Sequence, residues 1–352
     1  MSVTVGMIGC GGISKFHFSG LEKAGAKVAW VCDLSSESMA PWAAKFGART
    51  TSNYKDVLAD PAVQAVFVTT YSAAHKAICL DAIAAGKAIV CEKTLAENAQ
   101  DALAIVQAAQ KARTILYTSY MKRFIPAVAQ AKQLLGSMGQ IISTHIRAHQ
   151  CWGDLWTAAP TQGFFHATAG GQSEVRRRYG GGILHCGGSH ILDLVLFLLG
   201  RPTWLAASMH TPKGMDLDVQ AAVLMRTGNG TVLFEALAHP LGTIGFLRDG
   251  WDERVEITTT KGRLEIFSSS WNQVDSKASM LVHYDNASST AHEYRYSPVS
   301  PFDIAVENYC RSIEQGRQGQ PSEMSGYEVD NLIAHVQRSA ASNQALEVVW
   351  QA

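Results

Sequence analysis

The first 120 residues alternate strand-like apolar runs with helix-like segments, and this order restricts the fold more than any other feature. The apolar runs cover residues 3–9, 26–33, 62–70, 87–93 and 114–120, and the helical patterns cover residues 13–24, 35–47, 72–86 and 98–113. Alternating strands and helices with apolar strands are typical of a parallel sheet that is covered by helices on both faces. This part of the chain is therefore predicted to be an α/β domain.

The pattern changes after about residue 121. A helix is expected near residues 126–135, and long strand-like segments with turn signals between them then dominate. Two helical segments, near residues 302–315 and 326–344, complete the sequence. We therefore expect two domains. Residues 1–121 form the α/β domain, and residues 122–352 form an α+β domain with a large, mostly antiparallel open sheet.

Charge and hydropathy exclude several classes of protein. Thirty basic residues balance thirty acidic ones, so no overall charge attracts nucleic acid or an anionic membrane. The most apolar run, residues 191–199, is too short to cross a bilayer and contains Asp193. The N-terminus enters a strand pattern without a basic segment or cleavage site, and the seven cysteines lack CxxC spacing. We expect a cytoplasmic protein with reduced thiols.

A glycine-rich motif follows the first predicted strand. The stretch Gly9-Cys10-Gly11-Gly12-Ile13-Ser14 fits the pattern GxGxxG/A and begins a predicted helix, which is the context that a dinucleotide site requires. Gly9 permits the tight turn, and Gly11 lets the backbone approach a pyrophosphate at the helix N-terminus. Asp33 ends the second predicted strand, where its carboxylate can bind the ribose hydroxyls and repel a 2′-phosphate. The motif therefore predicts a site for NAD, with NADP disfavoured.

A second polar motif ends the strand in "AGKAIVCEKT", residues 85–94. Glu92 and Lys93 stand at the carboxyl end of this strand, and ligands bind at that edge of an open α/β sheet. A lysine there can reach the nicotinamide. Taken alone, a Glu-Lys pair at a strand end is more often a solvated ion pair.

A third stretch, "GGGILHCGGSHILDL" at residues 180–194, completes a recognisable set. The three motifs in this order resemble the glucose–fructose oxidoreductase/inositol dehydrogenase (Gfo/Idh/MocA) family, with its GxGxxA/G, AGKHVxxEKP and GGGxLxDxGxHxxDL patterns. The resemblance covers nearly the whole chain. It implies a Rossmann dinucleotide-binding domain and a substrate-binding and oligomerisation domain. It also implies an NAD cofactor, a sugar or cyclitol substrate, and a homodimer or homotetramer formed through the exposed sheet face.

Two residues depart from the family patterns. Thr94 replaces the proline after Glu-Lys, and Cys186 replaces the aspartate of DxGxH. In relatives that oxidise sugars or inositol, the lysine, this aspartate and the histidine surround the reacting hydroxyl. Only Lys93 and His190 carry over. His190 suits the acid/base role because its pKa lies near neutral pH, and Lys93 can polarise the same oxygen. Cys186 is expected to line the substrate pocket.

The local pattern around His190 predicts how it is presented. Ser189 is a suitable N-cap and Gly200 a suitable C-terminal residue, which places His190 in the first turn of a helix. The helix dipole there favours a neutral imidazole base. Asp193, three residues later, either orients the ring or caps the helix. The alternative is a purely structural histidine.

Two other roles are conceivable for this stretch, a metal site and a cysteine nucleophile. His185, Cys186 and His190 resemble metal ligands, but adjacent residues of an extended segment point to opposite faces and no fourth ligand is evident. We therefore expect no metal. A cysteine nucleophile is not expected either, because hydride transfer requires none.

Further contacts are expected from the loop at residues 152–182 and from the resemblance. Trp152 can stack on a sugar ring, and Arg178, next to Tyr179, can bind hydroxyls or an acidic substituent. A surface loop with packed aromatic residues is the alternative. The resemblance adds Arg123, with Lys122, on the substrate side. It also places the residues after two strand ends beside the cofactor, namely Thr70, His75 and Glu92.

These observations predict an NAD-dependent oxidoreductase that acts on a secondary hydroxyl or ketone of a sugar, glycoside or cyclitol. Two alternatives remain open. One is a redox-neutral lyase, epimerase or glycosidase that retains NAD and oxidises its substrate transiently. The other is a non-catalytic sensor of sugars or dinucleotides, for which the missing aspartate at Cys186 is the main support.

Overall fold

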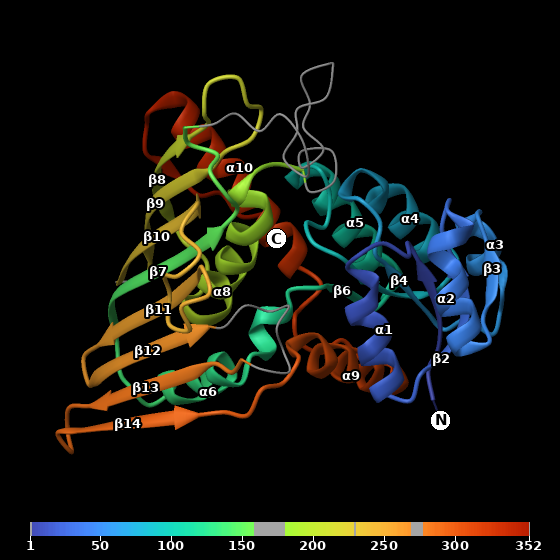
Figure 1. The fold of residues 1–352 in the computed structure, drawn as a ribbon, viewed down its shortest axis with the longest axis horizontal. Helices are drawn as coiled ribbons and strands as arrows, with labels where there is room; N and C mark the ends of the chain where they lie inside the picture. The colour runs from blue at the N-terminus through green and yellow to red at the C-terminus, as the bar shows by residue number, and fades with distance from the viewer. Residues whose placement is uncertain (1, 158–179, 229, 269–276, 352) are drawn as a thin grey trace. The chain divides into compact units, whose positions relative to one another are not determined.

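The computed structural model describes residues 2–157, 180–228, 230–268 and 277–351 (Figure 1). The chain divides into two compact units. Unit 1 consists of Met1–Met121 and Phe302–Asp330, and unit 2 of Lys122–Pro301 and Asn331–Ala352. The prediction had assigned all of residues 122–352 to the second domain, and for residues 302–330 the structure corrects it.

The sheet of unit 1 has six parallel strands in the order β3-β2-β1-β4-β5-β6. Its strands are β1 (Thr4–Ile8), β2 (Lys27–Cys32), β3 (Arg49–Thr51), β4 (Ala65–Val68), β5 (Ala88–Cys91) and β6 (Leu116–Thr118). Its helices before residue 121 are α1 (Ser14–Lys23), α2 (Ser36–Phe46), α3 (Tyr54–Ala59), α4 (Ser72–Ala84) and α5 (Ala99–Ala112). Every residue of β4 is buried, so both faces of the sheet are covered, as apolar parallel strands require. The short elements β3 and α3 were not predicted, because three strand residues carry no readable periodicity.

Helix α9 (Pro301–Glu314) explains why the C-terminal segment joins unit 1. The Phe302 ring stacks on Phe16 of α1 with 5.2 Å between ring centroids. Gly20 of α1 faces Val306, and a Cβ on Gly20 would lie 2.6 Å from the Val306 Cβ. A glycine on one helix therefore lets the other approach closely. Such a contact depends on two segments far apart in sequence, so local patterns do not reveal it.

Unit 2 contains a nine-stranded sheet in the order β14-β13-β12-β11-β7-β10-β9-β8-β15. Only the β10–β7 pair is parallel among the strand pairs of the described residues in this sheet, so the predicted, mostly antiparallel sheet is confirmed. The strands are β7 (Ile141–Cys151), β8 (Trp204–His210), β9 (Gln220–Thr227), β10 (Gly230–His239), β11 (Trp251–Thr259), β12 (Gly262–Ser268), β13 (Met280–Asp285), β14 (Thr290–Arg295) and β15 (Leu346–Glu347).

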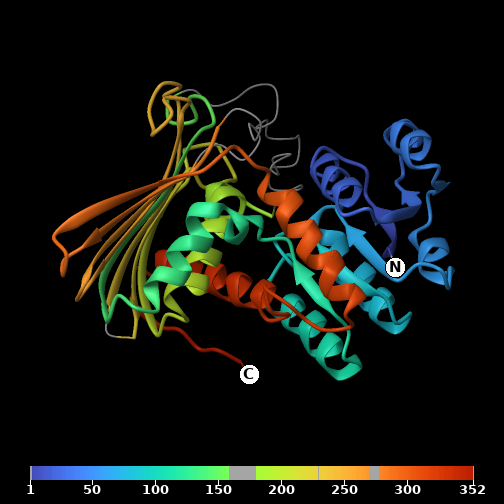
Figure 2. The same cartoon turned by 90° about the horizontal axis from the view of Figure 1, so that it is seen from below.

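Among the described residues, helices cover one face of this sheet and none covers the other. Helices α6 (Pro126–Leu135) and α8 (Ser189–Leu199) lie against the same face (Figures 1 and 2). Burial alternates along β10, as expected for strands with one packed and one open face. A short turn, η1 (Met121–Phe124), precedes α6. Helix α10 (Ser325–Ser342) contributes residues up to Asp330 to unit 1 and its remainder to unit 2.

Candidate active site

The glycine-rich turn between β1 and α1 has the shape that a dinucleotide requires. Gly9 has φ +99°, and a Cβ there would lie 2.7 Å from the Thr69 carbonyl carbon. A side chain at Gly9 is therefore excluded both by the backbone conformation and by the neighbouring strand end. At Gly11 and Gly12, by contrast, a Cβ would meet no described atom within 4 Å, so the outer side of this turn is open. Ser14 begins α1, and its Oγ donates to the Gly11 carbonyl at 2.7 Å.

Asp33 is held at the end of β2 by two backbone amides. Its Oδ2 accepts from the Cys10 N–H at 2.7 Å, and its Oδ1 accepts from the Ser35 N–H at 2.8 Å. The carboxylate therefore fastens the glycine-rich turn to the end of the next strand. A fixed acid at this position, beside an open glycine turn and a helix N-terminus, fits the ribose and pyrophosphate of a dinucleotide.

The two thiols beside this turn stay neutral. Burial, followed by the charge of Asp33, raises the pKa of Cys10 to about 12 and that of Cys32 to about 11. Neither sulfur is therefore a nucleophile at neutral pH. All seven cysteines of the chain lie in the described residues, and none of them forms a disulfide bond.

Glu92 and Lys93 follow β5 directly. Glu92 is buried, its Oε1 lies 2.7 Å from His17 Nε2, and its Oε2 accepts from the Lys93 N–H at 3.1 Å. Burial alone would raise the pKa of Glu92, but the His17 hydrogen bond and the charges of His17 and Lys93 hold it below its usual value. Lys93 is half-buried, and its peptide bond to Thr94 is cis.

Sequence reasoning missed His17. The only signal was its place on the buried face of α1, three residues after Ser14, where a titratable side chain requires a partner. The partner, Glu92, comes from a strand end 75 residues away. Local patterns could not identify it.

His75 supports two loops that follow β4 and β5. Its Nδ1 lies 3.0 Å from the Thr94 carbonyl, and its Nε2 lies 3.1 Å from the Thr70 carbonyl. Burial lowers the pKa of His75, and the hydrogen bonds to these carbonyls oppose this effect. Both nitrogens face the backbone, so His75 sets the shape of the loops at Thr70 and Thr94. Contact of Thr70 or His75 with the cofactor stays a prediction.

The helix that carries His190 begins earlier than predicted. A π-helical turn, η2 (Leu184–Gly188), runs directly into α8. Ser189 is therefore not an N-cap. It lies within the helical segment, and its Oγ donates to the His185 carbonyl at 2.7 Å. His190 is buried in the helical interior, so the proposed effect of a helix N-terminus on its ring does not apply.

The true cap comes from another part of unit 2. Asp218 Oδ1 accepts from the Gly182 N–H at 3.1 Å, and Oδ2 accepts from the Leu184 N–H at 2.8 Å. Burial raises the pKa of Asp218, and the amide hydrogen bonds oppose this rise. A Cβ on Gly182 would lie 2.0 Å from the Asp218 carbonyl oxygen, which explains a glycine at this position. Asp218 thus holds the beginning of the segment that presents His190.

Cys186 is half-buried in the π-helical turn, where its N–H donates to the Gly182 carbonyl at 3.0 Å. His185 and Cys186 lie in this helical turn and not in the extended segment that the sequence had suggested, so the prediction that they point to opposite faces was wrong. Among the described residues, no group of three or more His, Cys, Asp or Glu side chains is arranged to hold a metal ion.

The two cations after β6 are each paired with a buried carboxylate. Arg123 Nε donates to Asp193 Oδ2 at 2.8 Å, and Arg123 Nη2 donates to Asp193 Oδ1 at 2.6 Å. Lys122 donates to both oxygens of Glu253. Asp193 had been expected to orient His190 or cap its helix. Instead it binds Arg123, which had been expected on the substrate side.

Trp152 continues a chain of polar contacts from this cluster. Its Nε1 donates to Gln150 Oε1 at 3.1 Å, and Gln150 Nε2 donates to Glu253 Oε1 at 2.9 Å. A Cβ on Gly187 would lie 2.4 Å from Gln150 Nε2, so Gln150 packs directly on the π-helical turn. Arg178 and Tyr179 lie outside the described residues. No helix in the described ranges is both long and apolar enough to cross a membrane.

Comparisons with known proteins agree with this geometry. Residues 3–120 match an oxidoreductase family described as having an NAD-binding Rossmann fold, and residues 128–265 match the GFO/IDH/MocA C-terminal domain. Inositol 2-dehydrogenase from Burkholderia vietnamiensis is 31% identical over 97% of this chain and 96% of its own length. Inositol 2-dehydrogenase 3 from Saccharopolyspora erythraea is 24% identical over 99% of this chain and 96% of its own length.

Solved structures show the same fold. Levoglucosan dehydrogenase in complex with NADH and levoglucosan superposes with a TM-score of 0.82 at 21% identity, covering 99% of this chain and 100% of that one. An oxidoreductase domain protein from Kribbella flavida gives a TM-score of 0.84 at 24% identity, covering 99% and 100%. With both of its domains matched and a full-length relative above 30% identity, this chain belongs to the Gfo/Idh/MocA family of NAD-binding oxidoreductases.

Proposed function

We propose that this protein is a dehydrogenase that moves a hydride between NAD and a secondary hydroxyl or ketone of a cyclitol, sugar or glycoside. The observation that carries the proposal is the placement of Lys93. It follows β5 directly, its backbone is held by a buried carboxylate, and it belongs to the same unit as the glycine turn and Asp33. Relatives of similar length are named inositol 2-dehydrogenases, and a structural neighbour is named levoglucosan dehydrogenase.

Each residue has a distinct part in this mechanism. Bound NAD supplies the hydride acceptor or donor at the nicotinamide ring. Asp33 binds the ribose hydroxyls, and the open backbone at Gly11 and Gly12 approaches the pyrophosphate. The Lys93 ammonium polarises the substrate oxygen and stabilises alkoxide character, while the His190 imidazole takes or returns the hydroxyl proton.

An uncharged polyol is the substrate class that the described residues of unit 2 favour. Lys122 and Arg123 stand where the resemblance places substrate contacts, yet both are neutralised by buried carboxylates. A phosphorylated or carboxylated sugar would instead require cations whose charge is not already balanced. Trp152, held by Gln150, offers an aromatic surface suited to the C–H face of a ring.

The test is NADH formation by the purified protein with NAD and a panel of inositols, monosaccharides and anhydrosugars. Lys93→Met keeps side-chain length without the charge and is expected to lower kcat by about 10²–10⁴-fold. Lys76→Met is the matched control, because Lys76 lies on α4 and forms a partly exposed pair with Asp101. Full turnover by the Lys93→Met variant would refute the mechanism, and full activity of His190→Asn would return that histidine to a structural role.

Cys186 favours one alternative, a non-catalytic sensor of sugars or dinucleotides, because the family carboxylate is missing there. Such a protein would bind its ligand without converting it and without forming NADH. A Cys186→Asp variant, with Cys186→Ser as its control, separates the two proposals. Higher dehydrogenase turnover in Cys186→Asp alone would assign the missing carboxylate to the alcohol oxidation step.

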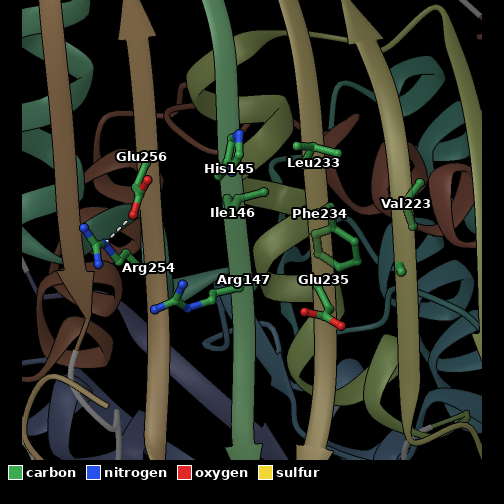
Figure 3. Close-up of a pocket in the computed structure, with 10 residues that line it drawn as sticks. His145, Ile146, Arg147, Val223, Leu233, Phe234, Glu235, Arg254 and Glu256 are labelled. Atoms are coloured by element: carbon green, nitrogen blue, oxygen red, sulfur yellow. Dashed lines mark ion pairs between the residues drawn. The ribbon is translucent and has the colours of Figure 1, made fainter.

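We also propose that the protein forms a homodimer or homotetramer through the open face of the nine-stranded sheet. Figure 3 shows part of this face, where Arg254 pairs with Glu256 at 2.7 Å. Leu224 and Leu233 lie opposite each other in the β9–β10 register and are 37% and 43% exposed. Leu233→Glu should shift the mass measured by light scattering to that of a smaller species. Leu241→Glu, at a 53% exposed loop residue, should not.

A further inference from the structure

One buried hydrogen bond joins helix α1 to the loop that carries Lys93. His17 Nε2 and Glu92 Oε1 are 2.7 Å apart, and the two residues are 1% and 6% exposed. The His17 ring meets Phe67 and Phe302 edge-on, with centroid distances of 5.7 Å and 5.4 Å. The pair therefore lies in an aromatic environment in which an unbalanced charge would be costly.

The surroundings indicate the protonation of the pair. Among the described residues, His17 Nδ1 has no hydrogen-bond partner, whereas Nε2 faces the carboxylate. A proton on Nε2 satisfies this arrangement, because an ionised carboxylate can only accept a hydrogen bond. Glu92 is ionised, since the hydrogen bond from His17 and the nearby charges keep its pKa low against the effect of burial.

The second oxygen of Glu92 continues the connection. Oε2 accepts from the Lys93 N–H at 3.1 Å, so a single carboxylate binds α1 on one side and the lysine backbone on the other. Helix α1 begins at Ser14, three residues before His17, and Ser14 closes the glycine-rich turn through its bond to the Gly11 carbonyl. The element that faces the dinucleotide pyrophosphate is therefore tied to Lys93 by two hydrogen bonds.

Stability alone does not explain this pair. A buried ion or hydrogen-bonded acid is weak evidence for stability, because an apolar side chain of similar volume often packs as well. Leucine at position 17 would suit the contacts with Phe67 and Phe302. The Glu92 carboxylate also accepts from the backbone N–H of Lys93, the proposed catalytic lysine. A pair with only a structural role would not require this second bond.

We propose that His17 is a positioning residue for Lys93. Through Glu92 it couples the position of α1, and thus the bound dinucleotide, to the placement of the lysine. The inference rests on the proposed function for the role of Lys93, but the coupling itself is a property of unit 1.

The kinetic test compares His17→Leu with His17→Gln. Glutamine places an amide N–H near the position of Nε2 and keeps the bond to Glu92, whereas leucine removes it. Misplacement of a catalytic group by about 1 Å costs roughly 10²-fold in rate. We therefore expect His17→Leu to lower kcat by about 10- to 100-fold with little change in the polyol KM. His17→Gln should stay within about threefold of the wild type, a difference of less than 1 kcal/mol in the barrier.

Glu92→Gln provides a second route should the leucine variant fail to fold. It preserves the side-chain shape but replaces the ionised acceptor, and it should reproduce the loss in kcat. Glu97→Gln, at an exposed position five residues later, is the matched control and should leave kcat unchanged. Equal kcat in Glu92→Gln and Glu97→Gln would overturn the proposal.

Hydrogen exchange at the Lys93 amide gives a readout that does not need turnover. In the wild type and in His17→Gln, NAD should slow this exchange, and in His17→Leu the slowing should be lost. Equal exchange in all three proteins would overturn the coupling even if kcat falls. If the wild type oxidises no polyol but shows this exchange pattern, the proposed function fails and the coupling stands. If the wild type oxidises a polyol and His17→Leu keeps full kcat, the proposed function stands and the coupling fails.

Discussion

Removing the Arg123 guanidinium should destabilise unit 2 far more than removing Arg123 and Asp193 together. The Asp193 carboxylate is fully buried on α8, and Arg123 satisfies both of its oxygens, at 2.8 Å and 2.6 Å. The guanidinium also lies 5.0 Å from the centre of the Phe197 ring. In Arg123→Met the methionine fills much of the same space, but it leaves a buried carboxylate without its cation.

The magnitude follows from the two hydrogen bonds. Each is a bond between charged groups, and such bonds contribute about 1.5–3 kcal/mol apiece. Their loss should lower the free energy of unfolding by about 3–6 kcal/mol. Removal of one partner of a buried ion pair generally costs a similar amount, about 3–5 kcal/mol. The double variant Arg123→Met/Asp193→Leu buries no charge at this position. Its free energy of unfolding should be within about 2 kcal/mol of that of the wild type. Arg123→Lys should fall between them, because lysine keeps the charge without the two-pronged geometry.

Hydrogen exchange of the α8 amides in increasing urea is the appropriate assay. It reports the free energy of opening of this helix directly, so it does not assume that two units unfold together. A double-mutant cycle then gives the coupling energy, which should be at least about 3 kcal/mol. The reasoning is refuted if the double variant loses as much free energy as the two single variants combined.

Three further predictions concern unit 1. Asp33→Asn should weaken NAD binding by about 10- to 100-fold, because it replaces the ionised acceptor that holds the glycine turn and is proposed to bind the ribose hydroxyls. Fluorescence titration with NAD measures this effect. The pKa of Glu92 is lower in the folded protein than its usual value of 4.5, so ionised Glu92 stabilises the fold above pH 4.5 and this contribution is lost as the pH falls through the folded-state pKa. In acid unfolding, the stabilities of the wild type and Glu92→Gln should therefore converge only at low pH. Gly20→Ala should cost about 1–3 kcal/mol by overpacking against Val306, and the added change Val306→Ala should restore most of the melting temperature.

Much of the candidate site could be predicted because its motifs are local. The glycine turn, the acid after β2 and the Glu-Lys pair after β5 each stand at a strand end, and the period of apolar residues marks such ends along the chain. The division of the sheets into parallel and mostly antiparallel follows from the same periodicity. Cys32 and Cys91, which end β2 and β5, are buried like the apolar residues of these strands.

The partners of the buried polar groups were not predictable in this way. His17 and Glu92 are 75 residues apart, and Arg123 and Asp193 are 70 residues apart. The start of the His190 helix was misplaced because a serine resembles a cap locally, while the actual cap, Asp218, comes from 34 or more residues away. Local periodicity encodes the direction and exposed face of a segment, but carries no information about which distant side chain will meet it.

The sequence by itself determined the alternation of the longer strands and helices, the dinucleotide turn and the family, because each depends on motifs whose residues are close together in the chain. Tertiary structure alone decided that residues 302–330 pack with unit 1. It also decided that Arg123 and Asp193 neutralise each other, and that Lys93 is tied to α1 through His17 and Glu92. The last two of these have a common physical reason. A buried charge or donor must find a partner, and only the folded chain determines which partner lies within hydrogen-bonding distance.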